Sequence, residues 1–385
     1  MEICNYEKCT GCSACENICP KECISMVYNE YGDIYPEINE KVCIKCKQCI
    51  NICPVNIKEV FNYPIKCYAS WSIDEKDRNS SSSGGVASVF SQTVIEKHGA
   101  VYGAEYDNGF AMKRECTAEG ILKFKGSKYV FCKTGNTYSQ AKKDLDDFKE
   151  VLYIGTPCQI AGLKAFLKKD YEKLITVDLI CHGTPSEELL NTYIKEKTGE
   201  MNIQNITFRE GEEWKLKVYN KNSCIMDIHS YNCLYFKSFI DKLTYRNSCY
   251  TCKYAGNKRV ADITIGDFWG IGNKEPVNYH TDKVSVVLIN TLKGKQFLNE
   301  NKEKLFLEER QILEAINGNA QLREPSNPHE DREKFKRVYV KKGFCKAVLT
   351  TTIGKNIIKN RIKQKILSLI PKKIKRVVNK KYKAL

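Results

Sequence analysis

The chain has 385 residues, of which 42% are hydrophobic and 28% charged, an ordinary balance for a globular protein of two or three domains. Its 20 cysteines are too many for core packing alone, yet too sparse for a small disulfide scaffold. The 18 basic residues after Glu333 exceed the net charge of +16, so residues 1–333 carry a net charge of −2 and the positive charge belongs to the C-terminal segment.

The N-terminal segment MEICNYEKCTGC lacks the basic and apolar stretches of a secretory signal, and no run of about 18 apolar residues is present. We therefore expect a cytoplasmic protein without a membrane span. Reducing conditions would leave the cysteines free for metal or redox chemistry, with burial as small hydrophobic side chains as the alternative.

An internal repeat fills residues 1–64, the first predicted domain. Each copy has the spacing Cys-x2-Cys-x2-Cys-x3-Cys-Pro, and residues 26–39 between the copies alternate around a turn, as in a short hairpin. In bacterial two-cluster ferredoxins with this spacing, the fourth cysteine of each run binds the other 4Fe-4S cube. A zinc site is the alternative, although zinc motifs usually pair two Cys-x2-Cys knuckles. The predicted ligands are Cys9, Cys12, Cys15 and Cys53 for one cube, and Cys43, Cys46, Cys49 and Cys19 for the other.

From residue 65 the pattern changes to that of an α/β body. Residues 65–73 predict a strand, and a loop rich in Ser and Gly at 80–85 leads into an amphipathic helix at 86–97. The start of that helix offers free N–H groups and a positive dipole end to a phosphate. A polar surface loop with a helix cap explains the same residues equally well.

Two further segments place a cysteine between a buried strand and a helix. Cys158 lies in the first turn of the first such helix, where we expect a lowered thiol pKa, and Cys181 ends the second strand. The carboxyl ends of strands are the places where α/β sheets bind their ligands. Together with Cys249 and Cys252 they make four thiols, the number that a third cube requires, whereas buried core cysteines are the alternative.

Six ordered motifs lie between residues 65 and 300. They are SSGGVAS (82–88), KGSKYV (125–130), GTPCQIAGL (155–163), VDLICHGTPS (177–186), CYTC (249–252) and ADITIGDFWG (261–270). In this order they closely resemble the beta subunits of coenzyme F420 hydrogenases and dehydrogenases. The resemblance implies an N-terminal family region at 65–150 and a C-terminal region at 151–330.

This resemblance also implies cofactors and site residues. A third 4Fe-4S cluster would be bound by Cys158, Cys181, Cys249 and Cys252. FAD contacts are implied for Ser83, Gly84, Gly85, Lys128, Thr156, Gln159 and Asp267. His182 is the candidate catalytic residue, as a proton or hydrogen-bond donor to reduced flavin, although a histidine that satisfies backbone groups at a strand end is the alternative. Flavin would connect one-electron clusters to a hydride acceptor.

The segment 331–385 has no recognised counterpart in that family. It is predicted to be a basic amphipathic tail, because isoleucines recur at helical spacing among lysines. Such a tail would contact a membrane surface or a partner protein, and a helix packed on the body is the alternative. Nucleic-acid binding is disfavoured because no stacking aromatic residues interleave with the lysines.

The expected fold is a small two-cluster ferredoxin domain of the α+β class, followed by a mixed α/β body that binds flavin and a cluster, and a basic helical tail. The expected function is that of an iron-sulfur flavoprotein oxidoreductase of anaerobic metabolism. It would move electrons between a ferredoxin or another redox protein and a hydride acceptor, which is coenzyme F420 or another small or glycan-linked molecule. The alternative is a non-catalytic iron-sulfur carrier that docks on a separate reductase.

Overall fold

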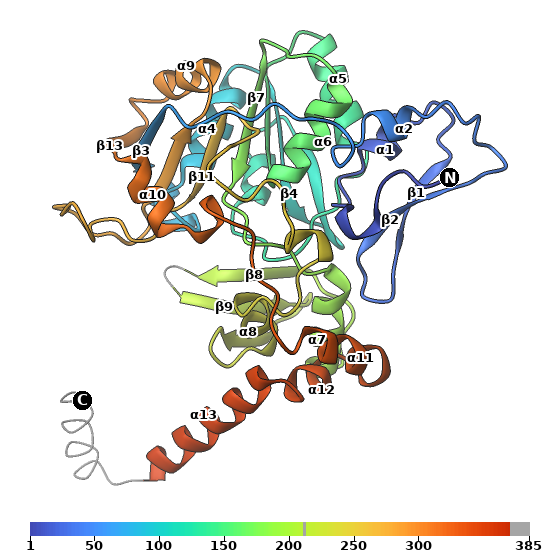
Figure 1. The fold of residues 1–385 in the computed structure, drawn as a ribbon. Helices are drawn as coiled ribbons and strands as arrows, with labels where there is room; N and C mark the ends of the chain where they lie inside the picture. The colour runs from blue at the N-terminus through green and yellow to red at the C-terminus, as the bar shows by residue number, and fades with distance from the viewer. Residues whose placement is uncertain (211–212, 370–385) are drawn as a thin grey trace.

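The computed structural model describes residues 1–210 and 213–369 (Figure 1). Its N-terminal module comprises the 3-10 turn η1 (Tyr6–Lys8), the short helices α1 (Ala14–Asn17) and α2 (Gln48–Asn51), and the strands β1 (Ile24–Tyr28) and β2 (Ile34–Ile38). The two strands pair antiparallel, with Ile24 opposite Ile38. The side chain of Asn29 accepts hydrogen bonds from the backbone N–H groups of Tyr31 and Asp33 and so closes the turn. The predicted hairpin is therefore confirmed.

The body is built on an eight-stranded sheet with the order β13-β3-β12-β11-β7-β6-β4-β5. Its strands are β3 (Lys66–Ser72), β4 (Ala100–Tyr106), β5 (Phe110–Glu115), β6 (Val151–Gly155), β7 (Leu174–Leu179), β11 (Ile263–Asp267), β12 (Ser285–Ile289) and β13 (Leu305–Arg310). The four central strands β4, β6, β7 and β11 are parallel, and the strands that flank them pair antiparallel. The central strands are continuous apolar runs because helices cover both of their faces.

Helices pack on both faces of this sheet. They are α3 (Glu75–Ser80), α4 (Val86–Glu96), α5 (Thr137–Asp146), α6 (Pro157–Leu167), α9 (Leu292–Glu300) and α10 (Ile312–Gly318), with 3-10 turns η2 (Gly120–Phe124), η3 (Asn247–Cys249) and η4 (Ala320–Leu322). Val101 and Leu152 pack with residues of α4 and α9, whereas the adjacent Tyr102 and Tyr153 pack with residues of α5 and α6. Successive residues of a strand point to opposite faces, so each strand serves two core layers. The mixed α/β architecture is therefore confirmed.

The N-terminal module docks on the side of the body that carries α5 and α6 (Figure 1). Asn17 donates its side-chain amide to the carbonyl oxygen of Gly135 at 2.7 Å. Tyr254 donates its hydroxyl to the carboxylate of Glu59, also at 2.7 Å. These contacts join both ends of the module to the body.

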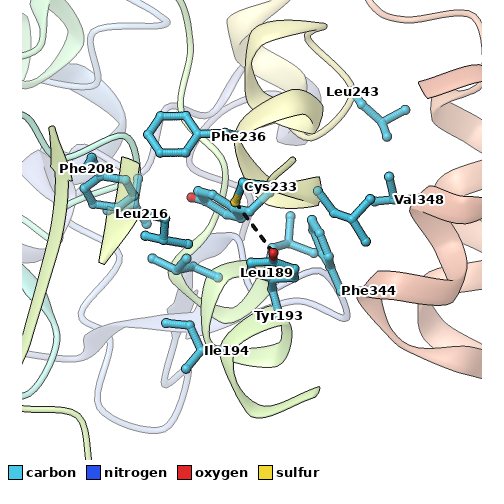
Figure 2. Packing of buried hydrophobic residues seen from close by; sticks show 14 of the residues in the cluster. Leu189, Tyr193, Ile194, Phe208, Leu216, Cys233, Phe236, Leu243, Phe344 and Val348 are labelled. Carbon is cyan, nitrogen blue, oxygen red and sulfur yellow. Dashed lines mark hydrogen bonds between the residues drawn. The ribbon is translucent and has the colours of Figure 1, made fainter. Parts of the chain in front are cut away.

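A smaller three-stranded sheet forms a second lobe. It consists of β8 (Asn205–Glu210), β9 (Glu213–Tyr219) and β10 (Cys224–His229), packed with α7 (Glu187–Thr198), α8 (Leu234–Ile240), α11 (Arg332–Lys342), α12 (Phe344–Leu349) and α13 (Thr352–Leu369). Figure 2 shows Tyr193, Phe208, Phe236 and Phe344 meeting in its interior, where the thiol of Cys233 donates to the hydroxyl of Tyr193 at 3.6 Å. The lobe therefore has its own hydrophobic core.

The C-terminal segment differs from the expected separate tail. Phe335, Phe344, Ile353 and Ile357 are each at most 3% exposed and belong to the core of the second lobe. The apolar face predicted for a membrane or partner thus packs on the body through residue 357, because it completes this core. Residues 370–385 of the predicted tail lie outside the described residues. Among the described helices, none is long and apolar enough to cross a membrane.

Candidate iron-sulfur sites

The two cysteine runs of the N-terminal module fold into loops of the same shape. The first loop passes through left-handed residues at Gly11 (φ 69°) and Ser13 (φ 61°) before α1 begins. The second passes through left-handed residues at Lys45 (φ 56°) and Lys47 (φ 61°) before α2. The equal spacing of the cysteines is therefore matched by the same backbone conformation in both loops.

The structure brings the first predicted set of thiols together. Cys9, Cys12, Cys15 and Cys53 are all at most 8% exposed. Burial raises the pKa of Cys12 to about 12, and the nearby thiolates of Cys53 and Cys9 contribute to the rise. Burial and the charges of Cys12, Cys9 and Cys53 likewise raise the pKa of Cys15. The fourth member thus comes from the other run, as in the predicted exchange.

The second predicted set lines one small cavity, which contains Cys19, Cys43, Cys46 and Cys49 together with Pro20 and Ile44. Cys46 is exposed, whereas every member of the first set is buried. The second site therefore faces outward.

A fifth cysteine accompanies each set. Cys4 lies beside Cys53 and Cys9, and its interactions with them, together with burial, raise its pKa. Cys23 lies 3.4 Å from Cys19, sulfur to sulfur, and burial raises its pKa to about 11. Both residues fall within the predicted neighbourhood of the cluster loops.

The third predicted set also meets in one cavity, inside the body. Cys158, Cys181, Cys249 and Cys252 line it, together with His182 and Thr10 of the first cysteine loop. Cys158 follows β6, Cys181 follows β7, and Cys249 lies in η3. The carboxyl ends of neighbouring parallel strands thus deliver two of the thiols to one place.

The predicted low pKa of Cys158 is wrong. Burial raises its pKa well above the ordinary value, and the nearby Cys252 thiolate adds to the rise, although Thr156 hydrogen-bonds to the thiol. Burial also raises the pKa of Cys181 to about 11 and that of Cys249 to about 12. Desolvation outweighs the helix N-terminus here, because the cavity lies inside the protein. A bound metal would deprotonate such thiols.

The donor sets suit cubes better than single metal ions. In residues 1–210 and 213–369, no three Cys, His, Asp or Glu side chains converge closely enough to hold one ion. A zinc ion draws its ligands to within about 2.3 Å, whereas a 4Fe-4S cube takes one thiolate at each of four irons and spaces them more widely. The second and third sets, each with four thiols around one cavity, match the arrangement of a cube.

Two buried arginines beside the third cavity were not predicted from the sequence. Arg246 and Arg259 are each 2% exposed and line the cavity. Arg259 pairs with Asp178 at 3.0 Å. Both stand close to the Cys249–Cys252 motif in sequence, but among 62 basic residues nothing in the pattern marks them.

The residues expected to hold the flavin phosphates form a closed turn. Ser83 accepts a hydrogen bond from Ser285, and a Cβ at Gly84 would meet the carbonyl oxygen of Ser70 at 2.4 Å. Gly85 has φ 85° and caps α4. A glycine is required at position 85 because φ is positive and because the carboxylate of Asp77 lies next to it.

Asp77 occupies the place predicted for a phosphate. Its carboxylate is buried at the start of α4, where one oxygen accepts hydrogen bonds from Ser88 and Lys125, both at 2.6 Å. The other oxygen is 3.1 Å from a Cβ placed on Gly85 and has no hydrogen-bond partner among the described residues. Asp77 and its ion-pair partner Lys125 already occupy the start of α4, and Gly84 packs against the carbonyl of Ser70, so the loop does not fit the phosphates of FAD.

Three other predicted flavin contacts have partners inside the protein. Lys128 donates to the carbonyl oxygens of Lys123, Phe124 and Lys125 at the end of η2, and burial lowers its pKa to about 8. Thr156 and Gln159 form the capping box of α6, and Gln159 also donates to the carbonyl of Cys132. These contacts give the three residues structural roles.

His182 and Asp267 lie at the carboxyl ends of the adjacent strands β7 and β11. Burial lowers the pKa of His182, and Lys242 lowers it further, while Asp267 acts in the opposite direction. The carboxylate of Asp267 pairs with Arg209 at 3.2 Å. Of the predicted flavin and catalytic residues, His182 and Thr156 reach the cysteine cavity.

Comparison with known proteins agrees with these features. Residues 148–315 match the C terminus of the coenzyme F420 hydrogenase/dehydrogenase beta subunit, and residues 8–57 match a 4Fe-4S dicluster domain. The chain is similar to the coenzyme F420-dependent sulfite reductase of Methanocaldococcus jannaschii, with 23% identity over 351 residues and 82% of this chain covered. This match covers 50% of the reductase, so the chain spans about half the length of the curated relative it matches.

A solved structure of the F420-reducing NiFe hydrogenase complex from Methanosarcina barkeri contains a chain that is 20% identical, with a TM-score of 0.46. The match covers 76% of this chain and 94% of that chain. The family matches confirm the resemblance of the sequence motifs. Behind a segment that matches a 4Fe-4S dicluster domain, the chain carries a region that matches the C terminus of the coenzyme F420 hydrogenase/dehydrogenase beta subunit family.

Proposed function

We propose that this protein is an iron-sulfur oxidoreductase that passes electrons between a one-electron redox protein and a hydride acceptor of the coenzyme F420 type. One observation carries the proposal. Four cysteines from separate segments of the body line a cavity that also contains Thr10, from the first cysteine loop of the ferredoxin module. A third redox centre placed there would adjoin the module directly.

The residues present fit three 4Fe-4S clusters, which supply one-electron transfer when bound. Cys9, Cys12, Cys15 and Cys53 would hold the inner cluster of the module, and Cys19, Cys43, Cys46 and Cys49 the outer one. Cys158, Cys181, Cys249 and Cys252 would hold the third, where burial excludes water. His182 lines the same cavity, and its lowered pKa keeps the imidazole neutral near pH 7, able to donate or accept a proton.

Hydride transfer requires two electrons at once, and FAD is the group that the family resemblance implies for this task. Because Asp77 occupies the start of α4, the Ser83–Gly85 loop does not fit the phosphates of FAD. We therefore assign no step to flavin. The flavin content of the purified protein is one of the quantities measured in the test below.

Anaerobic purification with iron, sulfide and flavin quantified on one sample tests the proposal. Three cubes require about twelve iron atoms per chain, and two require about eight. About twelve, together with reduction of coenzyme F420 by a reduced ferredoxin through the protein, would support it. About eight after reconstitution would contradict the third cluster.

A second candidate is a carrier subunit whose acceptor site lies on another polypeptide. The Ser83–Gly85 loop does not fit the phosphates of FAD, and this observation favours a hydride-transfer site on a separate protein. Under this proposal the purified chain accepts electrons into about twelve iron atoms but reduces no small acceptor. Activity that returns only with a separate reductase would establish it.

A further inference from the structure

Arg246 lies between the inner cysteine set and the third cavity. It belongs to the body, three residues before Cys249, yet its side chain hydrogen-bonds to the module. Its Nε donates to the carbonyl oxygen of Cys9 at 2.8 Å, and its Nη2 donates to that of Ile34 at 2.6 Å. The guanidinium is 2% exposed and also lines the third cavity.

The first cysteine loop is shaped to receive this guanidinium. A Cβ at Gly11 would lie 3.1 Å from Nη1 of Arg246. The equivalent residue of the second loop is Lys45, which has a similar left-handed backbone, with φ 56° against 69°. Since a lysine is accommodated at position 45, the backbone conformation alone does not require glycine at position 11. Glycine is required at position 11 because Arg246 occupies the space that a side chain would take.

The positive charge of Arg246 lies beside ligands of both sites. It donates to the backbone of Cys9 and lines the cavity that Cys249 and Cys252 share. The face of the guanidinium lies over the ring of Tyr35, with 4.3 Å from Cζ to the centroid, which shields it from water.

A second contact shows how close the two sites are. A Cβ at Gly162 in α6 would lie 3.1 Å from the sulfur of Cys12. Cys158 stands four residues earlier in the same helix, one turn away. The inner set and the third set therefore adjoin across α6 as well as across Arg246.

We infer that Arg246 is a positioning residue that joins the inner cluster site to the third cluster site and acts as the countercharge shared by both. This inference rests on the proposed function, because it requires clusters in both places. A reduced cluster carries one more negative charge than an oxidised one, and a buried cation favours the reduced form in a medium of low dielectric constant. The outer site is exposed at Cys46, so water and salt weaken the effect there.

Three variants of the full-length protein test this role. Arg246→Gln removes the charge, and Arg246→Lys keeps it. Arg78→Gln is the matched control, because Arg78 also donates to two backbone carbonyls and covers the ring of Trp71 at 4.5 Å, outside the cavities that the cysteine sets line. The readouts are iron content and the midpoint potential of each cluster from anaerobic redox titration followed by electron paramagnetic resonance.

Arg246→Gln should make the inner and third clusters at least tenfold harder to reduce, a fall of about 59 mV for a one-electron couple. The outer cluster should change less than threefold. Arg246→Lys should stay within threefold of the unmodified protein at all three clusters, and Arg78→Gln should change none of them.

Unchanged potentials in Arg246→Gln with full iron content would overturn the inference. Equal losses in the Gln and Lys variants, or failure of both to fold, would overturn it too, because the contacts and not the charge would then matter. If only the Gln variant fails to fold, native potentials in the Lys variant support the countercharge. About eight iron atoms in the unmodified protein would instead refute the proposed function, which separates the two failures.

Discussion

The two cysteine runs share their spacing and their left-handed backbone, yet they have opposite surroundings. Cys9, Cys12 and Cys15 are each 8% exposed; Cys9 and Cys12 adjoin the body at Arg246 and Gly162, and Gly11 leaves room for Arg246. In the second run Cys46 is exposed, and Ile44 beside it is 57% exposed. The repeat therefore sets the shape of each loop, whereas the body determines which loop is interior.

This difference in exposure sets the order in which electrons would pass through the proposed sites. The exposed Cys46 allows a partner protein to approach the outer run, while the inner run adjoins the third cavity through Arg246 and α6. Electrons from a partner would enter at the outer site and leave the module at the inner one. Substitutions at one end of this route should leave the other end intact.

The largest effect is expected from Cys252→Ser, which removes one thiol from the third cavity. Iron content should fall from about twelve to about eight atoms per chain, because one cube is lost. Both module clusters should remain reducible, while electron transfer to the acceptor falls to background. Cys224→Ser, at an exposed cysteine of β10, is the control and should keep all the iron. Full iron content in Cys252→Ser would contradict the assignment of this residue.

The contact across α6 can be opened with Gly162→Val. The first added carbon would already lie 2.6 Å from the hydroxyl of Tyr138 and 3.0 Å from Cβ of Cys12, so Tyr138, Cys12 or both must shift. Overpacking of this kind costs about 1–3 kcal/mol in the free energy of unfolding. We expect that loss in denaturant titrations, together with slower reduction of the third cluster and normal reduction of the outer one.

The partly buried Ala165 of the same helix provides the comparison for this substitution. Ala165→Ser should change the free energy of unfolding by less than about 0.5 kcal/mol. If Gly162→Val slowed reduction of all three clusters equally, the α6 contact would not be the step between the module and the body.

How much the sequence predicts depends on whether ligands are close together along the chain. The module is predictable because its eight expected ligands lie in two short runs, and the hairpin between them follows from alternation around a turn. The four body cysteines come from two strand ends and a distant Cys-x2-Cys pair. Without the structure, only the family resemblance assigns them to one site. The parallel central strands were predictable from their apolar runs.

Features that depend on tertiary packing cannot be predicted in this way. Arg246 gains its role from a carbonyl of Cys9, more than 200 positions away in the chain, and no local pattern records this contact. The glycines at 84 and 85 illustrate the opposite error, since a loop that suits a phosphate also suits close packing on β3 around Asp77. Burial likewise reverses the pKa expected for Cys158 at a helix start.

A smaller effect is expected at the surface of the outer run. Lys41, Lys45 and Lys47 are exposed around Cys46 with no acidic residue among them, which favours an acidic redox partner. Replacing all three with Glu should slow electron transfer from an acidic ferredoxin about tenfold at low ionic strength. The difference should vanish near 1 M salt, where the Debye length is about 3 Å.

Charge reversal elsewhere on the protein controls for net charge. Lys274, Lys295 and Lys302 are exposed on the sheet domain, and replacing them with Glu makes the same change in total charge. We expect less than a twofold change in rate for that variant in stopped-flow measurements. An equal slowing in both variants would mean that the partner responds to the whole protein and not to the outer run.

The smallest effect concerns the fifth cysteine beside each set. Cys4→Ala and Cys23→Ala each remove a thiol that interacts with an expected ligand, so the adjacent cluster should become harder to reduce while iron content is kept. A hydrogen bond is stronger where water is excluded, and the inner site is the more buried of the two. Redox titration should therefore show a larger shift for Cys4→Ala at the inner cluster than for Cys23→Ala at the outer one, both below tenfold. The reverse order would mean that exposure to water is not what distinguishes the two runs, and the direction of electron flow inferred from it would lose its physical basis.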